Sequence, residues 1–372
     1  METIRKSIIQ CKRCVNSFRR IDFIERKYCS ESPRATEPEW ERRVVTGIQP
    51  TGVLHVGNYF GAVRRCVRLQ DQGEDLTVFI ADLHSLTSTQ EPSALRQRSL
   101  ELAALLLASG IDPARSLVFA QSQVPRHAEL CWALCCVGTQ ARLRALPQYR
   151  ERAATTKEVP LGLLLYPVLQ AADVLAQRGT LVPAGRDQRQ HLQLAAHLAR
   201  AFASRYGPAF PEPKALLPDD GSDRILSLRD PAKKMSKSDP DPKSRILMTD
   251  PDDVIELKIR KSVTDCNPQV TYEPESRPGV SNLVALHCLA ADKLPEEAVE
   301  EAAALTTAQY KRVVARALCE HVAPLRERAA ALLRRPQLLR DALRHGAARA
   351  RARADVTYEH AARLMGVAAG GG

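Results

Sequence analysis

Short apolar runs alternate with longer helix-like segments along the first two thirds of the chain. The runs at 44–45, 76–81 and 117–120 are too short for helices and are predicted to be buried strands. Between them, residues 62–70 and 94–109 carry apolar side chains at helical spacing. Such alternation predicts an α/β fold with a doubly wound parallel sheet. Ligands are then expected beyond the carboxyl ends of the strands.

The strand signals fade after about residue 250, and a C-terminal α-helical domain is predicted from there on. Helical spacing of apolar residues is present in four segments, at 253–263, 280–289, 295–304 and 307–343. Pro324 and Pro336 are expected to interrupt the last segment, because proline removes a helix hydrogen bond. Residues 208–223, rich in Pro, Asp and Gly, are predicted to be a surface loop.

The N-terminal segment has a pattern of its own. One apolar stripe recurs at three- or four-residue spacing, at Ile4, Ile8, Cys11, Val15 and Phe18. Eight basic residues and only three acidic ones accompany it up to residue 28. A basic amphipathic N-terminus is typical of a mitochondrial targeting helix, whereas the alternative is a basic tail that contacts nucleic acid. We expect residues 1–38 to be a targeting or flexible segment of a mitochondrial matrix protein.

Composition narrows the class of partner. The formal net charge of +11 suits a polyanion. No apolar run approaches the roughly 20 residues that a membrane-spanning helix needs, so no membrane association is expected. The ten cysteines form no disulfide framework, which fits a reducing compartment. Cys11 and Cys14 lack the further ligands of a zinc site, so no protein-bound metal is predicted, and Cys135 and Cys136 are expected to be buried thiols.

Two motifs point to phosphate chemistry on ATP. Residues 47–58 read Gly-Ile-Gln-Pro-Thr-Gly-Val-Leu-His-Val-Gly-Asn and link a predicted strand to a predicted helix. A glycine turn before a helix lets backbone N–H groups face a phosphate. Far downstream, residues 233–240 read Lys-Lys-Met-Ser-Lys-Ser-Asp-Pro. Ammonium groups on such a loop can meet a polyphosphate whose charge grows in the transition state.

These two segments resemble the HIGH and KMSKS signatures of class I aminoacyl-tRNA synthetases. The chain from about Val44 onward is similar to the tryptophanyl-tRNA synthetase family, most closely its mitochondrial branch. Four further blocks occur in the family's order, at 81–85, 162–173, 182–188 and 261–265. The resemblance implies a Rossmann-type catalytic domain over residues 39–228, a KMSKS loop over 229–245 and a helical anticodon-binding domain over 246–372.

The activity implied by this resemblance is tryptophan–tRNA ligation in mitochondrial translation. Tryptophan and ATP would form tryptophanyl-adenylate with release of pyrophosphate, and the tryptophan would then pass to tRNA(Trp). ATP would be accompanied by Mg²⁺, held mainly by the phosphates. A homodimer is also implied. Arginines clustered in the C-terminal helices are expected to face tRNA: Arg326, Arg328, Arg334, Arg335, Arg340, Arg344, Arg349, Arg351 and Arg353.

Residues that match the family's functional positions fall into three overlapping groups. The catalytic group is His55, Asn58, Arg152, Lys234 and Lys237. The ATP-binding group is Gln49, His55, Gly57, Asn58, Gly185, Asp187, Gln188, Lys234, Met235, Ser236 and Lys237. The tryptophan-binding group is Val45, His84, Tyr166, Asp173, Val182 and Gln188, in which Asp173 would accept the indole N–H.

Three positions depart from the family pattern. Val45 stands where the family usually has an aromatic residue against the indole, and Arg186 replaces a glutamate beside the ATP site. Arg152 replaces a lysine that holds ATP phosphates, which keeps the charge but changes its shape. The departures at Val45 and Arg186 bear on affinity, because neither touches a group that carries the reaction, whereas the change at Arg152 bears on the strength of a phosphate contact.

The same residues disfavour four alternative functions. A tyrosyl-tRNA synthetase has the same fold and signatures, but the blocks at 47–52 and 166–173 favour tryptophan. A catalytically inactive tRNA-binding paralogue would be expected to have lost His55, Lys234 or Lys237, and all three are present. An adenylylating nucleotidyltransferase is disfavoured by the long helical domain, and a dehydrogenase by the lack of GxGxxG after a strand.

Overall fold

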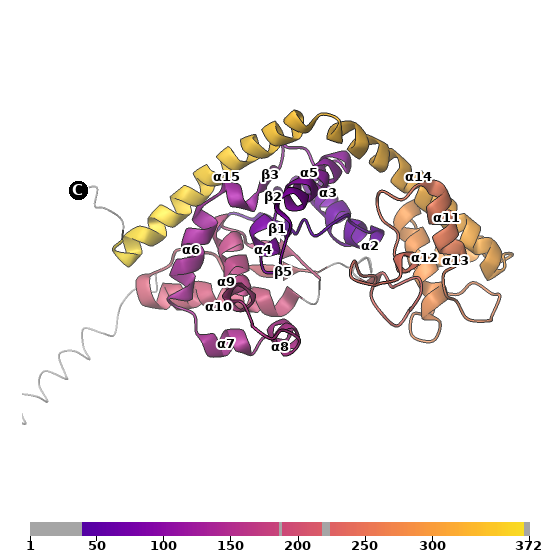
Figure 1. The fold of residues 1–372 in the computed structure, drawn as a ribbon, viewed down its shortest axis with the longest axis horizontal. Helices are drawn as coiled ribbons and strands as arrows, with labels where there is room; N and C mark the ends of the chain where they lie inside the picture. Colours follow the sequence, from indigo (N-terminus) through magenta and orange to yellow (C-terminus); the bar gives the residue numbers. More distant parts are fainter. Residues whose placement is uncertain (1–38, 186–187, 218–223, 368–372) are drawn as a thin grey trace, which may run out of the picture. The chain divides into compact units, whose positions relative to one another are not determined.

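A five-stranded sheet in the order β3-β2-β1-β4-β5, with all neighbours parallel, forms the centre of the fold (Figure 1). The structure, a computed structural model, describes residues 39–185, 188–217 and 224–367. The strands are β1 (Arg43–Ile48), β2 (Asp75–Ile80), β3 (Leu117–Ala120), β4 (Leu181–Pro183) and β5 (Lys214–Leu216). The doubly wound parallel sheet and its first three strands are thereby confirmed.

Strand β5 lies within the segment 208–223 that was predicted to be a loop, so that prediction is wrong for residues 214–216. The loop-like composition of the segment hid this strand, because only three residues pair with β4 and their backbone hydrogen bonds require no particular side chains. Residues 218–223 of the same segment lie outside the described residues.

Alternate residues of the central strands face two different hydrophobic clusters. Val44, Val78 and Val118 belong to one cluster, together with side chains of the helices that follow β1 and β2. Val45 and Phe79 belong to the other, on the opposite face. Because side chains alternate along a strand, the sheet is buried on both faces, which explains its unbroken apolar runs.

The helices of the sheet-containing part follow the strands in the expected order. Near the glycine motif these are α2 (Val56–Asn58), a π-helical turn (Tyr59–Val63) and α3 (Arg64–Asp71). The others are α4 (Asp82–Ser85), α5 (Pro92–Ala108), a 3₁₀ turn (Gln121–Gln123), α6 (Arg126–Cys135), α7 (Gln140–Arg144), α8 (Pro147–Ala154), α9 (Leu161–Ala176) and α10 (Arg189–Tyr206). A π-helical turn is a rare form that often occurs at functional sites, and no sequence pattern indicated it.

The C-terminal region is helical, as predicted. After a 3₁₀ turn (Pro242–Ser244) its helices are α11 (Asp252–Arg260), α12 (Pro278–Ala291), α13 (Pro295–Glu301), α14 (Thr307–Leu333) and α15 (Pro336–Met365) (Figure 1). Pro336 interrupts the last segment as expected, at the first position of α15, where a missing N–H costs nothing. The predicted interruption at Pro324 is wrong, because α14 runs through it with Val322 and Leu325 buried on either side.

Several of the arginines expected to face tRNA make contacts within the chain. Arg353 pairs with Asp75, Arg326 with Asp252 and Arg344 with Asp341 on its own helix. Carbonyl oxygens accept hydrogen bonds from Arg328, Arg349 and Arg351. Arg334, Arg335 and Arg340 are exposed. Contact of this cluster with tRNA stays a prediction, since Arg344, Arg349 and Arg351 are exposed as well and guanidinium groups serve carbonyls, carboxylates and phosphates alike.

The described residues from Glu41 onward form one compact unit, and the predicted N-terminal segment 1–38 lies outside the described residues. The domain boundaries after residues 228 and 245 stay predictions. In the described part of the chain, no helix has the length and apolar character to cross a membrane. Cys136 is exposed and Cys135 partly so, which corrects their prediction as buried thiols.

Candidate active site

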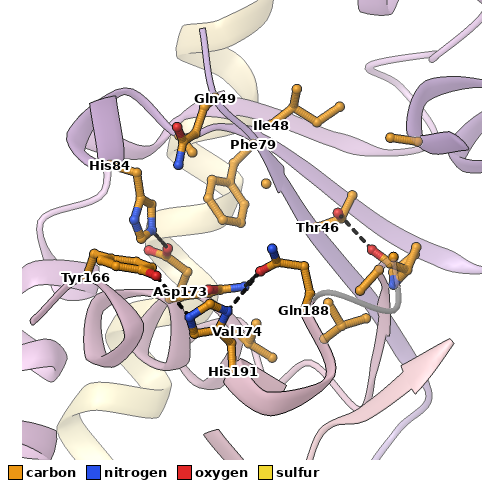
Figure 2. A pocket seen from close by; sticks show the side chains of 18 of the residues that line it. Thr46, Ile48, Gln49, Phe79, His84, Tyr166, Asp173, Val174, Gln188 and His191 are labelled. Carbon is orange, nitrogen blue, oxygen red and sulfur yellow. Dashed lines mark hydrogen bonds and ion pairs between the residues drawn. The ribbon is translucent and has the colours of Figure 1, made fainter. Parts of the chain in front are cut away.

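A pocket of about 440 Å³ opens at the carboxyl ends of β1 and β4, where the fold predicts ligands. Figure 2 shows it from close by. Twelve of the predicted site residues line it: Val45, Gln49, Gly57, Asn58, His84, Arg152, Tyr166, Asp173, Val182, Gly185, Gln188 and Lys234. The other predicted residues do not: His55, Met235, Ser236 and Lys237 lie outside its lining, and Asp187, like Arg186, lies outside the described residues.

Asp173 on α9 is completely buried and accepts three hydrogen bonds, of which Figure 2 shows the one from His84. Its Oδ2 accepts from His84 Nε2 at 2.8 Å, and its Oδ1 accepts from Gln121 Nε2 at 2.7 Å and His127 Nδ1 at 2.8 Å. Burial by itself raises the pKa of Asp173, but the hydrogen bonds from the two histidines outweigh it and hold the pKa below its usual value. The pocket therefore contains a buried, ionised carboxylate.

The residues that hydrogen-bond to Asp173 are themselves held by further hydrogen bonds behind the pocket. His127 donates from Nδ1 to the carboxylate, so its Nε2 is left to accept from the amide of Gln177 at 3.0 Å. Gln177 also donates to the carbonyl of Ala350 on α15. Sequence reasoning missed His127 and Gln121, because residues that contact a functional group only through space carry no local motif.

A second chain of hydrogen bonds crosses the pocket floor (Figure 2). The hydroxyl of Tyr166 lies 3.1 Å from His191 Nε2, and His191 Nδ1 lies 3.2 Å from Gln188 Oε1. Gln188 Oε1 also accepts from Gln170 Nε2 at 3.2 Å. With Nδ1 donating to the amide oxygen, Nε2 of a neutral His191 accepts from the tyrosine. Gln170 and His191 were not predicted, although each lies one helical turn from a predicted residue.

The glycine motif forms a turn that ends in a capped helix. Gly52 has φ of +112°, a conformation that side chains rarely adopt. His55 caps α2, and its Nδ1 accepts from the backbone N–H of Asn58 at 3.2 Å. Burial lowers the pKa of His55 to about 4, aided by Lys237, Arg245 and Lys234. The imidazole is therefore neutral near pH 7, and its proton resides on Nε2.

Backbone hydrogen bonds between residues 54–56 and 246–248 hold the lysine-rich loop against the glycine motif. Val56 N–H donates to Ile246 O at 2.9 Å, and Met248 N–H donates to Leu54 O at 2.9 Å. In the loop itself, Lys237 Nζ donates to Gly52 O at 3.1 Å, whereas Lys234 is exposed and lines the pocket. Burial lowers the pKa of Lys237 to about 8. Two motifs that are far apart in sequence thus meet at one site.

Two predicted contacts differ from expectation in detail. Met235 is 3 % exposed, belongs to the hydrophobic core and does not line the pocket. Arg152 on α8 lies at the pocket with its guanidinium carbon 5.9 Å from the ring centre of Tyr166. The planar guanidinium that replaces lysine thus lies near an aromatic ring, a contact that arginine favours.

Comparisons with known proteins agree with this geometry. A sequence model of the family "tRNA synthetases class I (W and Y)" matches residues 37–323. The tryptophan–tRNA ligase of Caulobacter vibrioides is 40% identical over 87% of this chain and 95% of its own length. The chain belongs to the tryptophanyl-tRNA synthetases of class I. The tryptophan–tRNA ligase 1 of Streptomyces coelicolor is likewise 40% identical, over 87% of this chain and 97% of its own length.

Solved structures of other tryptophanyl-tRNA synthetases share the fold. The enzyme of Mycoplasma pneumoniae superposes with a TM-score of 0.81 at 29% identity, over 88% of this chain and 98% of that one. The Campylobacter jejuni enzyme, solved with ADP and tryptophan, gives a TM-score of 0.74 at 30% identity, over 87% and 99% of the two chains. The similarity spans both the sheet and the helical C-terminal region.

Proposed function

We propose that this synthetase activates L-tryptophan with ATP and transfers it to tRNA(Trp) in the mitochondrial matrix. The observation that carries the proposal is the meeting, at one pocket, of a buried ionised Asp173 with the glycine and lysine motifs. The tryptophan carboxylate would attack the α-phosphorus of ATP. The bond between this phosphorus and the pyrophosphate oxygen would break, so that tryptophanyl-adenylate forms and pyrophosphate leaves. Since no protein nucleophile takes part, positioning and charge stabilisation supply the acceleration.

The tryptophan side chain is assigned to the half of the pocket around Asp173. A carboxylate offers about four acceptor sites, and three donors reach it from the described residues. The indole N–H would take the remaining site, on the side that lines the pocket. Tyr166, His84 and Gln188 would surround the substrate, with Val45 and Val182 as apolar walls.

ATP is assigned to the half formed by the two motifs. His55, neutral with its proton on Nε2, would donate to a phosphate oxygen, and Asn58, Gly57 and Gln49 would lie beside it. Lys234 and Lys237 would neutralise the departing pyrophosphate, and Arg152 would hold phosphates from α8. Gly185, Asp187, Met235 and Ser236 stay assigned to ATP by family resemblance.

Magnesium is proposed to enter with ATP. Groups of three or more His, Cys, Asp or Glu side chains suited to a metal are not found in the described ranges. The residues at the pocket therefore fit an ion that is coordinated mainly by phosphate oxygens. Such an ion would neutralise part of the phosphate charge, and the lysines would supply the remaining positive charge.

The mitochondrial location and the homodimer rest on resemblance and on two features of this chain. The N-terminal segment is basic and amphipathic, as targeting helices are. On α6, Trp132 is 72% exposed, and a large exposed aromatic side chain is typical of a protein interface. A second copy of the chain is the partner proposed to cover it. The exposed Arg334, Arg335 and Arg340 support contact with tRNA.

Pyrophosphate exchange into ATP tests the activity. We expect purified protein that lacks residues 1–28 to catalyse exchange with tryptophan and not with tyrosine, because the substrate must donate an N–H to Asp173. Exchange with tyrosine would assign the chain to tyrosyl-tRNA synthetases in function. Absence of exchange with either amino acid, in protein that melts cooperatively, would favour the inactive tRNA-binding paralogue.

Lys237 predicts the pH dependence of activation. Its pKa is lowered to about 8, so the ammonium is present below pH 8 and is lost as the pH rises above it. We expect kcat/KM for ATP, which reports the free enzyme, to fall above about pH 8. Lys237→Arg keeps its charge and should move this decline to higher pH. An identical decline in the arginine variant would show that another group causes it.

A further inference from the structure

Phe79 lies at the tryptophan half of the pocket, although no motif marked it. It is on β2 directly opposite Gly47 of β1 in the parallel register, and both residues line the pocket with Val45 (Figure 2). The side chain is 4% exposed. An aromatic ring therefore forms part of the pocket wall at the position where two central strands end.

The ring occupies space that a side chain at position 47 would otherwise fill. A Cβ built on Gly47 would lie 2.4 Å from both Cε2 and Cζ of Phe79, closer than carbon atoms approach. Val45, two residues before Gly47, faces the same side of β1, and it belongs to the same hydrophobic cluster as Phe79. The absence of a side chain at position 47 therefore leaves the room that the ring of Phe79 takes, beside Val45 in the same cluster.

Phe79 and Asp173 share one support. The ring of Phe79 stacks on Phe119 with centroids 5.9 Å apart and an angle of 23°, and it meets the His127 ring edge-on, also at 5.9 Å. His127 in turn donates to Asp173. The apolar wall and the carboxylate are thus held at a set distance and angle by the same imidazole, as recognition of a flat, N–H-bearing ring requires.

We propose that Phe79 is the aromatic wall against which the indole packs, at a pocket where position 45 carries only a valine. This inference rests on the proposed function and adds a specificity-determining residue to it. Offset or edge-on contact between aromatic rings stabilises binding beyond the burial of area. Gly47 is required for the same reason, because any side chain there would displace the ring.

Equilibrium binding of tryptophan to the full-length protein, measured by calorimetry without ATP, tests the proposal. We expect Phe79→Leu to weaken tryptophan binding roughly 10-fold, with the KM for ATP unchanged. The matched control is Phe202→Leu, which removes a buried ring of the same hydrophobic cluster that does not line the pocket. Unchanged tryptophan affinity in Phe79→Leu, or an equal loss in Phe202→Leu, would overturn the proposal.

A reciprocal pair of variants tests whether the two positions share one space. Val45→Phe alone should weaken tryptophan binding, because two rings would compete for the same volume. Val45→Phe combined with Phe79→Leu should restore affinity to within about threefold of wild type. The double variant also decides the matter if Phe79→Leu is unstable, since it refills the cavity. Tighter binding by Val45→Phe alone, or weak binding by a cooperatively folded double variant, contradicts the proposal.

Failure of this inference is distinguishable from failure of the proposed function. Wild-type protein that binds no tryptophan would contradict both. Wild-type protein that binds tryptophan and catalyses exchange, with an affinity that Phe79→Leu does not alter, would leave the function intact and remove Phe79 from the pocket's recognition of indole.

Discussion

Lys237→Ala is expected to lower the rate of tryptophan activation by roughly 10²–10³-fold, the effect of removing one preorganised charge-stabilising group. Lys237 Nζ is held 3.1 Å from Gly52 O, at the turn proposed to bind phosphate. Burial lowers its pKa to about 8, so the site solvates the ammonium poorly and an anionic phosphate would pair with it strongly. Tryptophan affinity should stay within about twofold, because Lys237 does not line the pocket.

Lys233→Ala is the matched control for this experiment. Lys233 belongs to the same loop, but it is exposed and pairs with Asp230 at 2.8 Å. Single-turnover formation of tryptophanyl-adenylate and calorimetric binding of tryptophan should be measured for both variants. An activation rate in Lys237→Ala equal to that of Lys233→Ala would refute the role of Lys237 in stabilising pyrophosphate.

Asp173→Asn is expected to reduce kcat/KM for tryptophan by roughly 10²-fold or more and to narrow discrimination against tyrosine and phenylalanine. The carboxylate accepts from His84, Gln121 and His127, and an amide in its place would turn an N–H group toward donors. A buried polar group left without a partner costs about 1–3 kcal/mol. The same mismatch should lower the free energy of unfolding, so thermal melting must be measured alongside the kinetics.

Asp82→Asn is the control that separates recognition of the indole by Asp173 from the general effect of losing one acidic side chain. Asp82 lies at the start of α4, accepts from Ser122 and does not line the tryptophan pocket. We expect its kcat/KM ratio between tryptophan and phenylalanine to match wild type. Asp173→Asn that folds normally and retains the wild-type ratio would exclude this carboxylate from reading the indole.

The linear sequence by itself determined the class of fold and the chemistry. Short, mostly apolar runs at 44–45, 76–81 and 117–120 predicted buried parallel strands, because the strands of a sheet covered on both faces are apolar on both sides. The motifs around His55 and Lys237 indicated phosphate chemistry, because each is a contiguous stretch of sequence with one local geometry. Contiguous features of this kind can be predicted without any knowledge of tertiary contacts.

Tertiary structure alone decided which residues surround the functional groups. His127, Gln121 and Phe79 come from different elements, and only the folding of the sheet brings them to Asp173. The path of α14 through Pro324 was likewise decided by burial of its flanks, which outweighs one lost hydrogen bond. The physical reason is common to all these cases: local spacing determines hydrogen bonding along the backbone, whereas contacts between side chains distant in sequence depend on how the finished elements pack.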